Sequence, residues 1–155
     1  MTKILFVCLG NICRSPMAEA VFRHQVKEAG LADKIEIDSA GTGDWHVGER
    51  PHQGTLAKMA EHGISTEGMR ARQITVADGK YYDYIVAMDD SNMKNMRKVF
   101  GTTHAKMLRL LDVLDDDLTE VPDPYYTGDF EQTYDLVKRA SEALLIKIKR
   151  EQAIV

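Results

Sequence analysis

Short apolar runs alternate along the chain with segments in which apolar residues recur at helical spacing. The run from Lys3 to Val7 is unbroken, which fits a strand that is buried on both faces of a sheet. Three shorter runs of the same kind predict strands at Ile35–Asp38, Tyr84–Met88 and Met107–Leu111. Because helical segments separate the strands, we expect right-handed crossovers and a parallel sheet.

The segments between the strands carry signals that start and stop helices. Ser15 and Pro16 predict a helix start, with Ser15 as the N-cap and Pro16 at the first helical position, and Gly30 predicts the end. Helical spacing predicts further helices over His52–His62, over about Ser91–Phe100, and over a last segment that Asp129 caps.

Length, composition and charge narrow the class of protein. A chain of 155 residues suits a single domain, 1–155, and 44% hydrophobic with 28% charged residues is ordinary for a soluble globular protein. The formal net charge of −4 offers no basic surface, so we expect no nucleic-acid partner. No apolar run is long enough to span a membrane or to form a signal-peptide core, which predicts no membrane insertion and a cytoplasmic location.

The chain has two cysteines, Cys8 and Cys13. A disulfide between them would close a very short loop and add little stability, whereas such cysteines in a reducing compartment are more often catalytic or redox-active. None of the five histidines has zinc-ligand spacing, and no calcium-loop pattern surrounds the acidic run Asp115–Asp117. We therefore expect neither a metal nor a cofactor.

The candidate chemistry lies between the first strand and the first helix, from Cys8 to Pro16. The chain has to turn sharply there, and Gly10 and Asn11 are residue types that tolerate a positive φ. Such a loop points backbone N–H groups inward at a helix N-terminus and forms an anion site, to which Arg14 adds a bidentate fork. The same field favours a Cys8 thiolate beneath a bound phosphate, where Ser15 could donate a hydrogen bond to sulfur.

The spacing of Cys8 and Arg14 is a weak signal alone, since it arises by chance in roughly one chain in ten. A buried structural role would account for Cys8, because free cysteine is among the most buried residue types. It would leave Arg14 unexplained, because a cation at a helix start opposes the helix dipole unless an anion lies between them. The context of strand, Gly-Asn turn and Ser-Pro therefore favours a phosphate site.

The stretch from Val7 to Ala20 resembles the opening of the low-molecular-weight protein tyrosine phosphatases almost residue for residue. The likeness continues in order and spacing at Asp38–Thr42, Ala71–Ile74, Tyr84–Asp89 with Asn92, and Asp123–Tyr125. The resemblance implies a flavodoxin-like fold, three α/β/α layers with a four-stranded parallel sheet. It also implies hydrolysis of phosphotyrosine proteins or peptides and small aryl phosphates through a phosphocysteine intermediate.

The resemblance implies roles for individual residues. Cys8 matches the nucleophile, Arg14 the phosphate clamp and Asp123 the general acid and base. The other matched positions form the phosphate-binding loop, its polar support and the aromatic walls of the pocket. They are Leu9, Gly10, Asn11, Ile12, Cys13, Arg14 and Ser15 in the loop, Asn11, Ser15 and Ser39 in the support, and Trp45 and Tyr125 in the walls.

Three of these positions lie in the longest irregular segments, residues 41–51 and 112–128, which we expect at the carboxyl ends of strands. Asp123 alone would indicate a turn between two prolines, but a tyrosine leaving group of pKa ~10 benefits from an acid opposite Cys8. Trp45 could instead fold back onto the core. Of Tyr125 and Tyr126, we expect one to face the pocket and the other the surface.

One position departs from the family pattern. Many relatives carry a histidine immediately before an Arg-Ala-Arg-Gln stretch, and it helps to tie the loop network together. This chain has Met69 there, followed by Arg70. Either the network is looser in this protein or another group takes the place of the histidine.

Four other functions are weighed against phosphotyrosine hydrolysis. An arsenate reductase of the same fold needs cysteines downstream of Cys13, and there are none. Protein-arginine phosphatases resemble this loop but carry threonine in place of Ile12, and an apolar branched residue fits a flat tyrosine ring better. A flavodoxin-type carrier favours hydroxyl residues in its phosphate loop, and a silent phosphopeptide-binding module has no need of both Cys8 and Asp123.

The second cysteine suggests redox control. Cys8 and Cys13 lie in one tight loop, which could bring the two sulfurs within disulfide range. A Cys8 thiolate is the form that peroxide oxidises first, to sulfenic acid, and Cys13 could then resolve it as a disulfide. The alternative is that Cys13 is a small packing residue.

Overall fold

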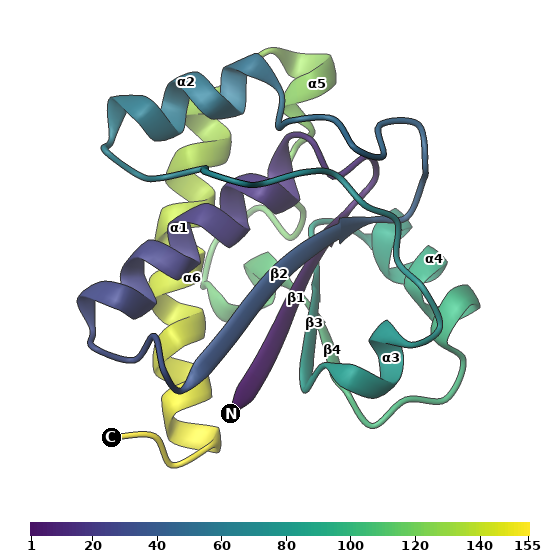
Figure 1. Ribbon diagram of the computed structural model, residues 1–155, viewed down its shortest axis with the longest axis vertical. Helices are drawn as coiled ribbons and strands as arrows, with labels where there is room; N and C mark the ends of the chain where they lie inside the picture. The colour runs from purple at the N-terminus through teal and green to yellow at the C-terminus, as the bar shows by residue number, and fades with distance from the viewer.

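The computed structural model describes residues 1–155 and places a four-stranded sheet at the centre of the molecule (Figure 1). The strands are β1 (Thr2–Cys8), β2 (Ile35–Gly41), β3 (Tyr84–Ala87) and β4 (Lys106–Arg109). They lie in the order β2-β1-β3-β4, and every neighbouring pair is parallel. The predicted parallel sheet is therefore confirmed.

Helices cover both faces of this sheet. They are α1 (Arg14–Glu28), α2 (Gln53–Glu61), α3 (Asp78–Tyr81), α4 (Asp90–Phe100), the 3-10 helix η1 (Leu110–Val113), α5 (Pro124–Thr127) and α6 (Phe130–Glu151). Alternate residues of β1 face opposite layers: Ile4 and Phe6 pack with α1 and α6, whereas Leu5 and Val7 pack with α4. Two apolar cores on either side of one sheet confirm the flavodoxin-like three-layer fold.

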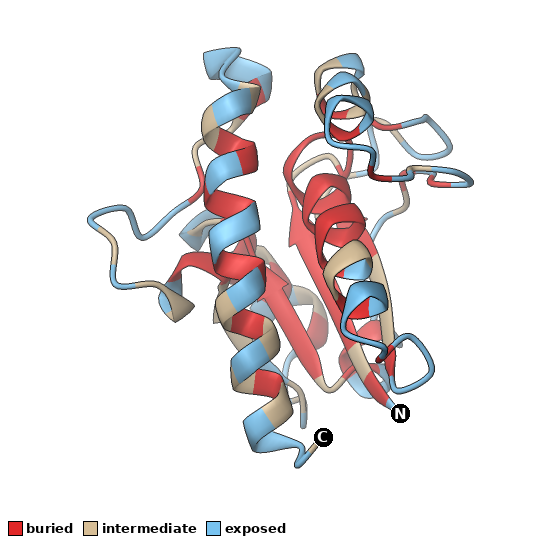
Figure 2. Ribbon diagram, turned by 90° about the vertical axis from the view of Figure 1, so that its left-hand side faces the viewer, coloured by how far each residue is buried: buried red, intermediate tan, exposed pale blue.

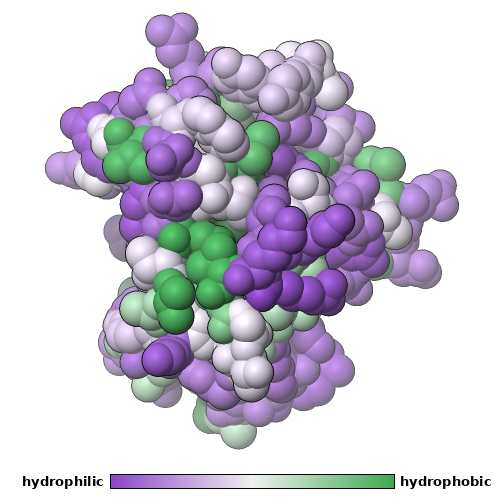
Figure 3. Space-filling model, turned by 90° about the vertical axis from the view of Figure 1, so that its right-hand side faces the viewer, coloured by the Kyte–Doolittle hydropathy of each residue, from purple (hydrophilic) through white to green (hydrophobic).

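The two helical layers are amphipathic. Figure 2 shows the side with α1 and α6, where buried positions form a stripe along α6 that includes Tyr134, Val137, Ala140, Leu144 and Ile148. The opposite side, in Figure 3, is mostly hydrophilic, with its largest apolar patch near the centre. No helix in the molecule combines the length and the apolar character needed to cross a membrane.

The first helix starts differently from the prediction. Helix α1 begins at Arg14, and its N-cap residue Cys13 makes no side-chain capping bond. The prediction of Ser15 as N-cap and Pro16 as the first helical residue was therefore wrong. The reason is that the Ser15 hydroxyl lies 2.9 Å from the sulfur of Cys8 and also accepts a hydrogen bond from Asn11, so it does not face the helix end.

The other elements lie close to their predicted places, with boundaries that shift by one to three residues. The predicted strand at Met107–Leu111 ends early, at Arg109, whose backbone N–H and Nε–H both donate to the carboxylate of Asp112 where the chain turns into η1. His52 is the N-cap of α2 and accepts from the N–H of Gly54. Asp89, just beyond β3, is the N-cap of α4.

The site-bearing loops lie at one edge of the sheet. The segments 41–51 and 112–128 follow β2 and the β4–η1 unit, at the carboxyl ends of the strands, as predicted. Two four-residue helices, α3 and α5, were missed by the sequence reasoning. A single turn is too short to show the 3.6-residue periodicity on which that reasoning relied.

Candidate active site

The loop between β1 and α1 is tied to the segment that follows β2. The carbonyl groups of Cys8, Leu9 and Ile12 accept hydrogen bonds from the N–H groups of Thr42, Gly43 and His52 at 2.7–2.9 Å. Gly41 makes this approach possible, because a Cβ there would lie 2.9 Å from the carbonyl oxygen of Leu9. The carbonyl side of the loop therefore faces away from α1 and into the 41–52 segment.

The N–H side of the same loop remains open. The backbone N–H groups of residues 9–15 donate to no acceptor in the chain, although the residues from Asn11 to Ser15 are buried. Asn11 adopts the left-handed conformation, with a φ of 56°. Gly10 does not, contrary to the prediction, and its lack of a side chain instead accommodates the ring of His46. Unpaired donors at a helix N-terminus form an anion-binding site.

Arg14 is buried and held from one side. Its NH1 group donates to Asp89 Oδ2 at 2.7 Å and to the carbonyl of Val121 at 3.0 Å, while NH2 lies 3.3 Å from Asp123 Oδ2. Burial opposes the charge, but the nearby Cys8, Asp89 and Asp123 raise the pKa of Arg14 above its ordinary value. Its buried Nε–H has no protein partner. The guanidinium is therefore fixed in the charged state with one donor edge free.

Sequence reasoning missed Asp89 as a member of this site. In the sequence Asp89 belongs only to the matched segment Tyr84–Asp89, whereas in the structure its two carboxylate oxygens have separate partners. Oδ1 accepts from the N–H of Asn92 at the start of α4, and Oδ2 accepts from Arg14. The sequence signal was an acidic residue directly after a buried strand, at the same sheet edge as Cys8.

A polar network joins the loop to β2. Asn11 Nδ2 donates to Ser15 Oγ at 2.8 Å and to Ser39 Oγ at 2.9 Å. The N–H of Arg72 donates to Asn11 Oδ1 at 3.0 Å, which fixes the orientation of the amide. The three residues expected to support the loop are thus brought together, and the chain of contacts ends at Cys8 Sγ.

The end of this network that is farthest from Cys8 lies beside Met69, the position that departs from the family pattern. Ser39 Oγ donates to Glu19 Oε1 at 2.6 Å, and the other oxygen of Glu19 accepts from Arg23. Met69 is buried in the apolar core beside them, and its side chain makes no hydrogen bond. A carboxylate paired with arginine therefore occupies the outer end of the network in this protein.

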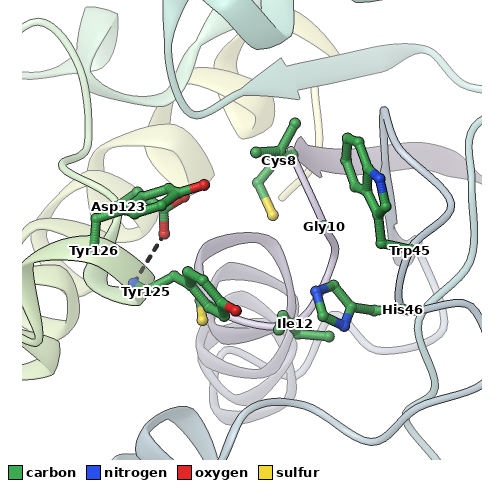
Figure 4. A pocket seen from close by; sticks show the side chains of 10 residues that line it. Cys8, Gly10, Ile12, Trp45, His46, Asp123, Tyr125 and Tyr126 are labelled. Carbon is green, nitrogen blue, oxygen red and sulfur yellow. Dashed lines mark hydrogen bonds between the residues drawn. The ribbon is translucent and has the colours of Figure 1, made fainter.

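Cys8 lies at the floor of a pocket of about 360 Å³ (Figure 4). Trp45 and His46 stand on one side and Asp123, Tyr125 and Tyr126 on the other. Trp45 does not fold back onto the core: its ring packs against Gly43 and remains 68% exposed. Such open aromatic faces suit a flat ligand.

Two pocket residues differ from the sequence expectation. Both Tyr125 and Tyr126 line the pocket, where one was expected to face the surface; Tyr126 is 74% exposed and forms the outer rim. His46 is not among the site residues that the sequence predicted, yet it lines the pocket, and its Nδ1 lies 2.6 Å from Glu49 Oε2. Its position directly after Trp45 was the available signal.

Asp123 reaches the pocket from the side opposite Trp45 and His46. It is the N-cap of α5, and Oδ1 accepts from the N–H of Tyr125 at 3.0 Å, which is the dashed line in Figure 4. Its carboxylate and the sulfur of Cys8 line the same pocket, although they lie 115 positions apart in the sequence. A thiol and a carboxyl group thus face one ligand space.

Cys13 is a second buried thiol beside the first. Burial, and then the neighbouring Cys8, raise the pKa of Cys13 to about 12. Its thiol is therefore protonated at neutral pH.

Nowhere in the chain do three or more histidine, cysteine or acidic side chains gather as metal ligands.

Comparison with known proteins agrees with this geometry. The model of the low molecular weight phosphotyrosine protein phosphatase family matches residues 3–154. This chain belongs to that family. Among curated members, the low molecular weight protein-tyrosine-phosphatase YfkJ of Bacillus subtilis is 51% identical over 99% of this chain and 100% of its own, and PtpA of Staphylococcus aureus is 41% identical over 97% and 96%.

Solved structures of the family share the fold. The crystal structure of YfkJ superimposes with a TM-score of 0.95 at 50% identity, covering 97% of this chain and 96% of its own. A Drosophila arginine phosphatase superimposes with a TM-score of 0.87 at 33% identity, covering 96% and 98%. The same scaffold is thus found in proteins named as a tyrosine phosphatase and as an arginine phosphatase.

Proposed function

We propose that this protein hydrolyses phosphotyrosine in proteins or peptides, and small aryl phosphates, through a covalent intermediate on Cys8. One observation carries the proposal: the sulfur of Cys8 lies at the floor of an aromatic-walled pocket, inside a loop whose N–H groups at residues 9–15 are unpaired. Those donors and the free edge of Arg14 suit the oxygens of a phosphate dianion. The family membership supports the same activity.

In the first step the Cys8 thiolate attacks phosphorus, so that an S–P bond forms and the bond to the phenolic oxygen breaks. Asp123 donates a proton to that oxygen, and tyrosine leaves as a neutral phenol. The loop amides and Arg14 bind the phosphoryl oxygens, where negative charge is concentrated during transfer. Arg14 is oriented for this by its bonds to Asp89 and to Val121.

In the second step Asp123 accepts a proton from water, and the water oxygen attacks phosphorus. The S–P bond breaks, inorganic phosphate is released, and Cys8 returns as a thiolate while Asp123 is again protonated. The hydroxyl of Ser15, 2.9 Å from the sulfur, donates a hydrogen bond to the departing thiolate. A thiolate stabilised in this way is a better leaving group.

The proposal predicts a ranking of substrates. Turnover of a phosphotyrosine peptide should greatly exceed that of matched phosphoserine and phosphoarginine peptides, measured side by side as phosphate release. Serine is too short for its phosphate to reach Cys8 at the floor, and Ile12, which lines the pocket, offers an arginine no polar partner. Efficient phosphoserine hydrolysis would contradict the deep pocket, and faster phosphoarginine hydrolysis would identify an arginine phosphatase instead.

Replacing Tyr125 with alanine should raise KM for aryl phosphates by about tenfold and change kcat less. The ring supplies contact area to the substrate but does not touch the reacting atoms, and an aromatic contact is worth about 1 kcal/mol beyond its buried area. Tyr81 on α3 is 45% exposed and does not line the pocket, so Tyr81→Ala is the matched control. An equal effect of both changes would exclude a wall role for Tyr125.

Oxidation should be reversible because of the second cysteine. Peroxide converts the Cys8 thiolate to sulfenic acid, and the Cys13 thiol then condenses with it, releasing water and forming a disulfide. The high pKa of Cys13, about 12, leaves Cys8 as the thiol that peroxide attacks first. After peroxide and then dithiothreitol, the unchanged chain should recover most of its activity and show a Cys8–Cys13 cross-link by mass spectrometry. A Cys13→Ser variant should regain a much smaller share of its own starting activity; equal recovery would leave Cys13 as a packing residue.

A further inference from the structure

A buried carboxylate lies outside the pocket but in contact with its polar network. Glu19, in the first half of α1, is only 5% exposed, and it does not line the pocket of Cys8. Both of its oxygens are used: Oε1 accepts from Ser39 at 2.6 Å, and Oε2 accepts from Arg23 one turn along the helix. The reaction proposed above gives this pair no task.

The carboxylate of Glu19 and the N–H of Arg72 together determine which way the hydrogen bonds of the network run. An ionised carboxylate can only accept, so the single proton of Ser39 points to Glu19. The oxygen of Ser39 is then left to accept from Asn11, whose amide orientation Arg72 fixes.

The same logic continues to the sulfur. Asn11 also donates to Ser15 Oγ, so the proton of Ser15 must go to another acceptor. Two are in reach, the sulfur of Cys8 at 2.9 Å and the carbonyl oxygen of Ala40 at 3.5 Å, and the sulfur is the closer. The hydrogen bonds therefore run in one direction along the network, and the hydroxyl proton of Ser15 points to the sulfur of Cys8.

We propose that Glu19, held ionised by Arg23, is a positioning residue that orients the Ser39–Asn11–Ser15 hydrogen bonds so that Ser15 donates to the Cys8 thiolate. This inference rests on the proposed function for its catalytic meaning, but the orientation itself is a property of the protein without substrate. It also explains how the network is completed in a chain with Met69 where many relatives carry a histidine.

The surroundings of Glu19 explain the need for Arg23. Burial raises the pKa of Glu19, and the hydrogen bonds and charge of Arg23 and Ser39 act in the opposite direction. The charged groups around the same hollow are Arg23 of α1, Asp38 of β2, and Glu67 and Arg70 of the loop that carries Met69. Asp38 opposes the ionised form, and Arg23 is the cation in contact with it.

The test measures the reactivity of Cys8 directly, by its rate of alkylation with iodoacetamide as a function of pH. Glu19→Gln should move the midpoint upward by about half to one pH unit, because an amide has one acceptor where the carboxylate used two. If the charge of Glu19 acted on Cys8 only through space, its removal would favour the Cys8 thiolate and move the midpoint of the alkylation profile downward. Asp135→Asn, which breaks an equivalent exposed pair with Arg139 on α6, should leave the midpoint unchanged.

A double-mutant cycle shows whether the effect passes through Ser39. Ser39→Ala should raise the midpoint by itself, and adding Glu19→Gln to it should raise the midpoint no further. A fall or no change with Glu19→Gln, or an equal further rise in the Ser39→Ala background, would overturn the proposal. The measurements are made in a Cys13→Ser background, which assigns the signal to Cys8, because both thiols line the pocket.

Arg23→Gln provides a second route if Glu19→Gln does not fold, since Arg23 lies at the surface with 46% of its side chain exposed. Without Arg23, Glu19 should take up a proton within the accessible pH range and add a second step to the alkylation profile. A profile with a single step at a shifted pH would mean that only a distant charge had been lost, and it would overturn the proposal. Because alkylation needs no substrate, these results stand even if phosphotyrosine turnover by the unchanged chain is absent, which would refute the proposed function alone.

Discussion

Replacing Cys8 with serine should lower phosphotyrosine turnover by a factor on the order of 10⁴ or more, the scale on which enzymes lose activity when their nucleophile is removed. A serine hydroxyl at the pocket floor has a far higher pKa than a thiol and would face phosphorus as a poor nucleophile. The change is nearly isosteric, and Cys8 is buried at the end of β1, so we expect the fold to persist.

The same variant should still bind inorganic phosphate, because the donors at residues 9–15 belong to the backbone and are unchanged. The measurement pairs steady-state hydrolysis with calorimetric titration of phosphate. Loss of both turnover and phosphate binding would point to a collapsed loop, and substantial residual turnover would show that Cys8 is not the nucleophile.

Replacing Asp123 with asparagine should slow phosphotyrosine hydrolysis by roughly 10²–10⁴-fold, the usual contribution of a positioned general acid. The loss should be much smaller for an aryl phosphate with electron-withdrawing ring substituents, whose phenolate leaves without a proton. Asparagine is as good an N-cap as aspartate, so the start of α5 should remain in place.

Asp129 offers a matched control for this change. It is the N-cap of α6 as Asp123 is of α5, and it accepts from the N–H of Gln132, but it does not line the pocket. Asp129→Asn should leave both substrates nearly unaffected. Equal losses on both substrate types in Asp123→Asn would argue against an acid role and for a purely structural one.

Local patterns predicted the parts of the site that are close in sequence. The strand before Cys8, the tight turn at Asn11 and the helix after it follow from apolar runs and turn chemistry over a few positions. Local patterns could not predict that Asp123 faces Cys8 across the pocket. That placement depends on how β4, η1 and α5 return the chain to the same sheet edge. It came from the family resemblance.

The misses have a common physical cause. Ser15 has the chemistry of an N-cap, yet the sulfur of Cys8 and the amide of Asn11 compete for its hydroxyl. Gly10 suits a positive φ, yet its role is to leave room for His46. In both cases a contact made in the folded site decided the outcome over the local preference, as happens often at functional sites.

The bonds between the carbonyl side of the phosphate loop and the segment that follows β2 have a consequence for the energetics of transfer. Each bonded carbonyl, at Cys8, Leu9 and Ile12, fixes the plane of the peptide group that it shares with the next N–H. The dipoles around the sulfur are thus oriented before the phosphate binds, and they need not rotate as negative charge moves from the sulfur to the phosphoryl group and the leaving oxygen. Water would have to reorganise at each such event; this loop behaves as a solvent that is already polarised in the required direction.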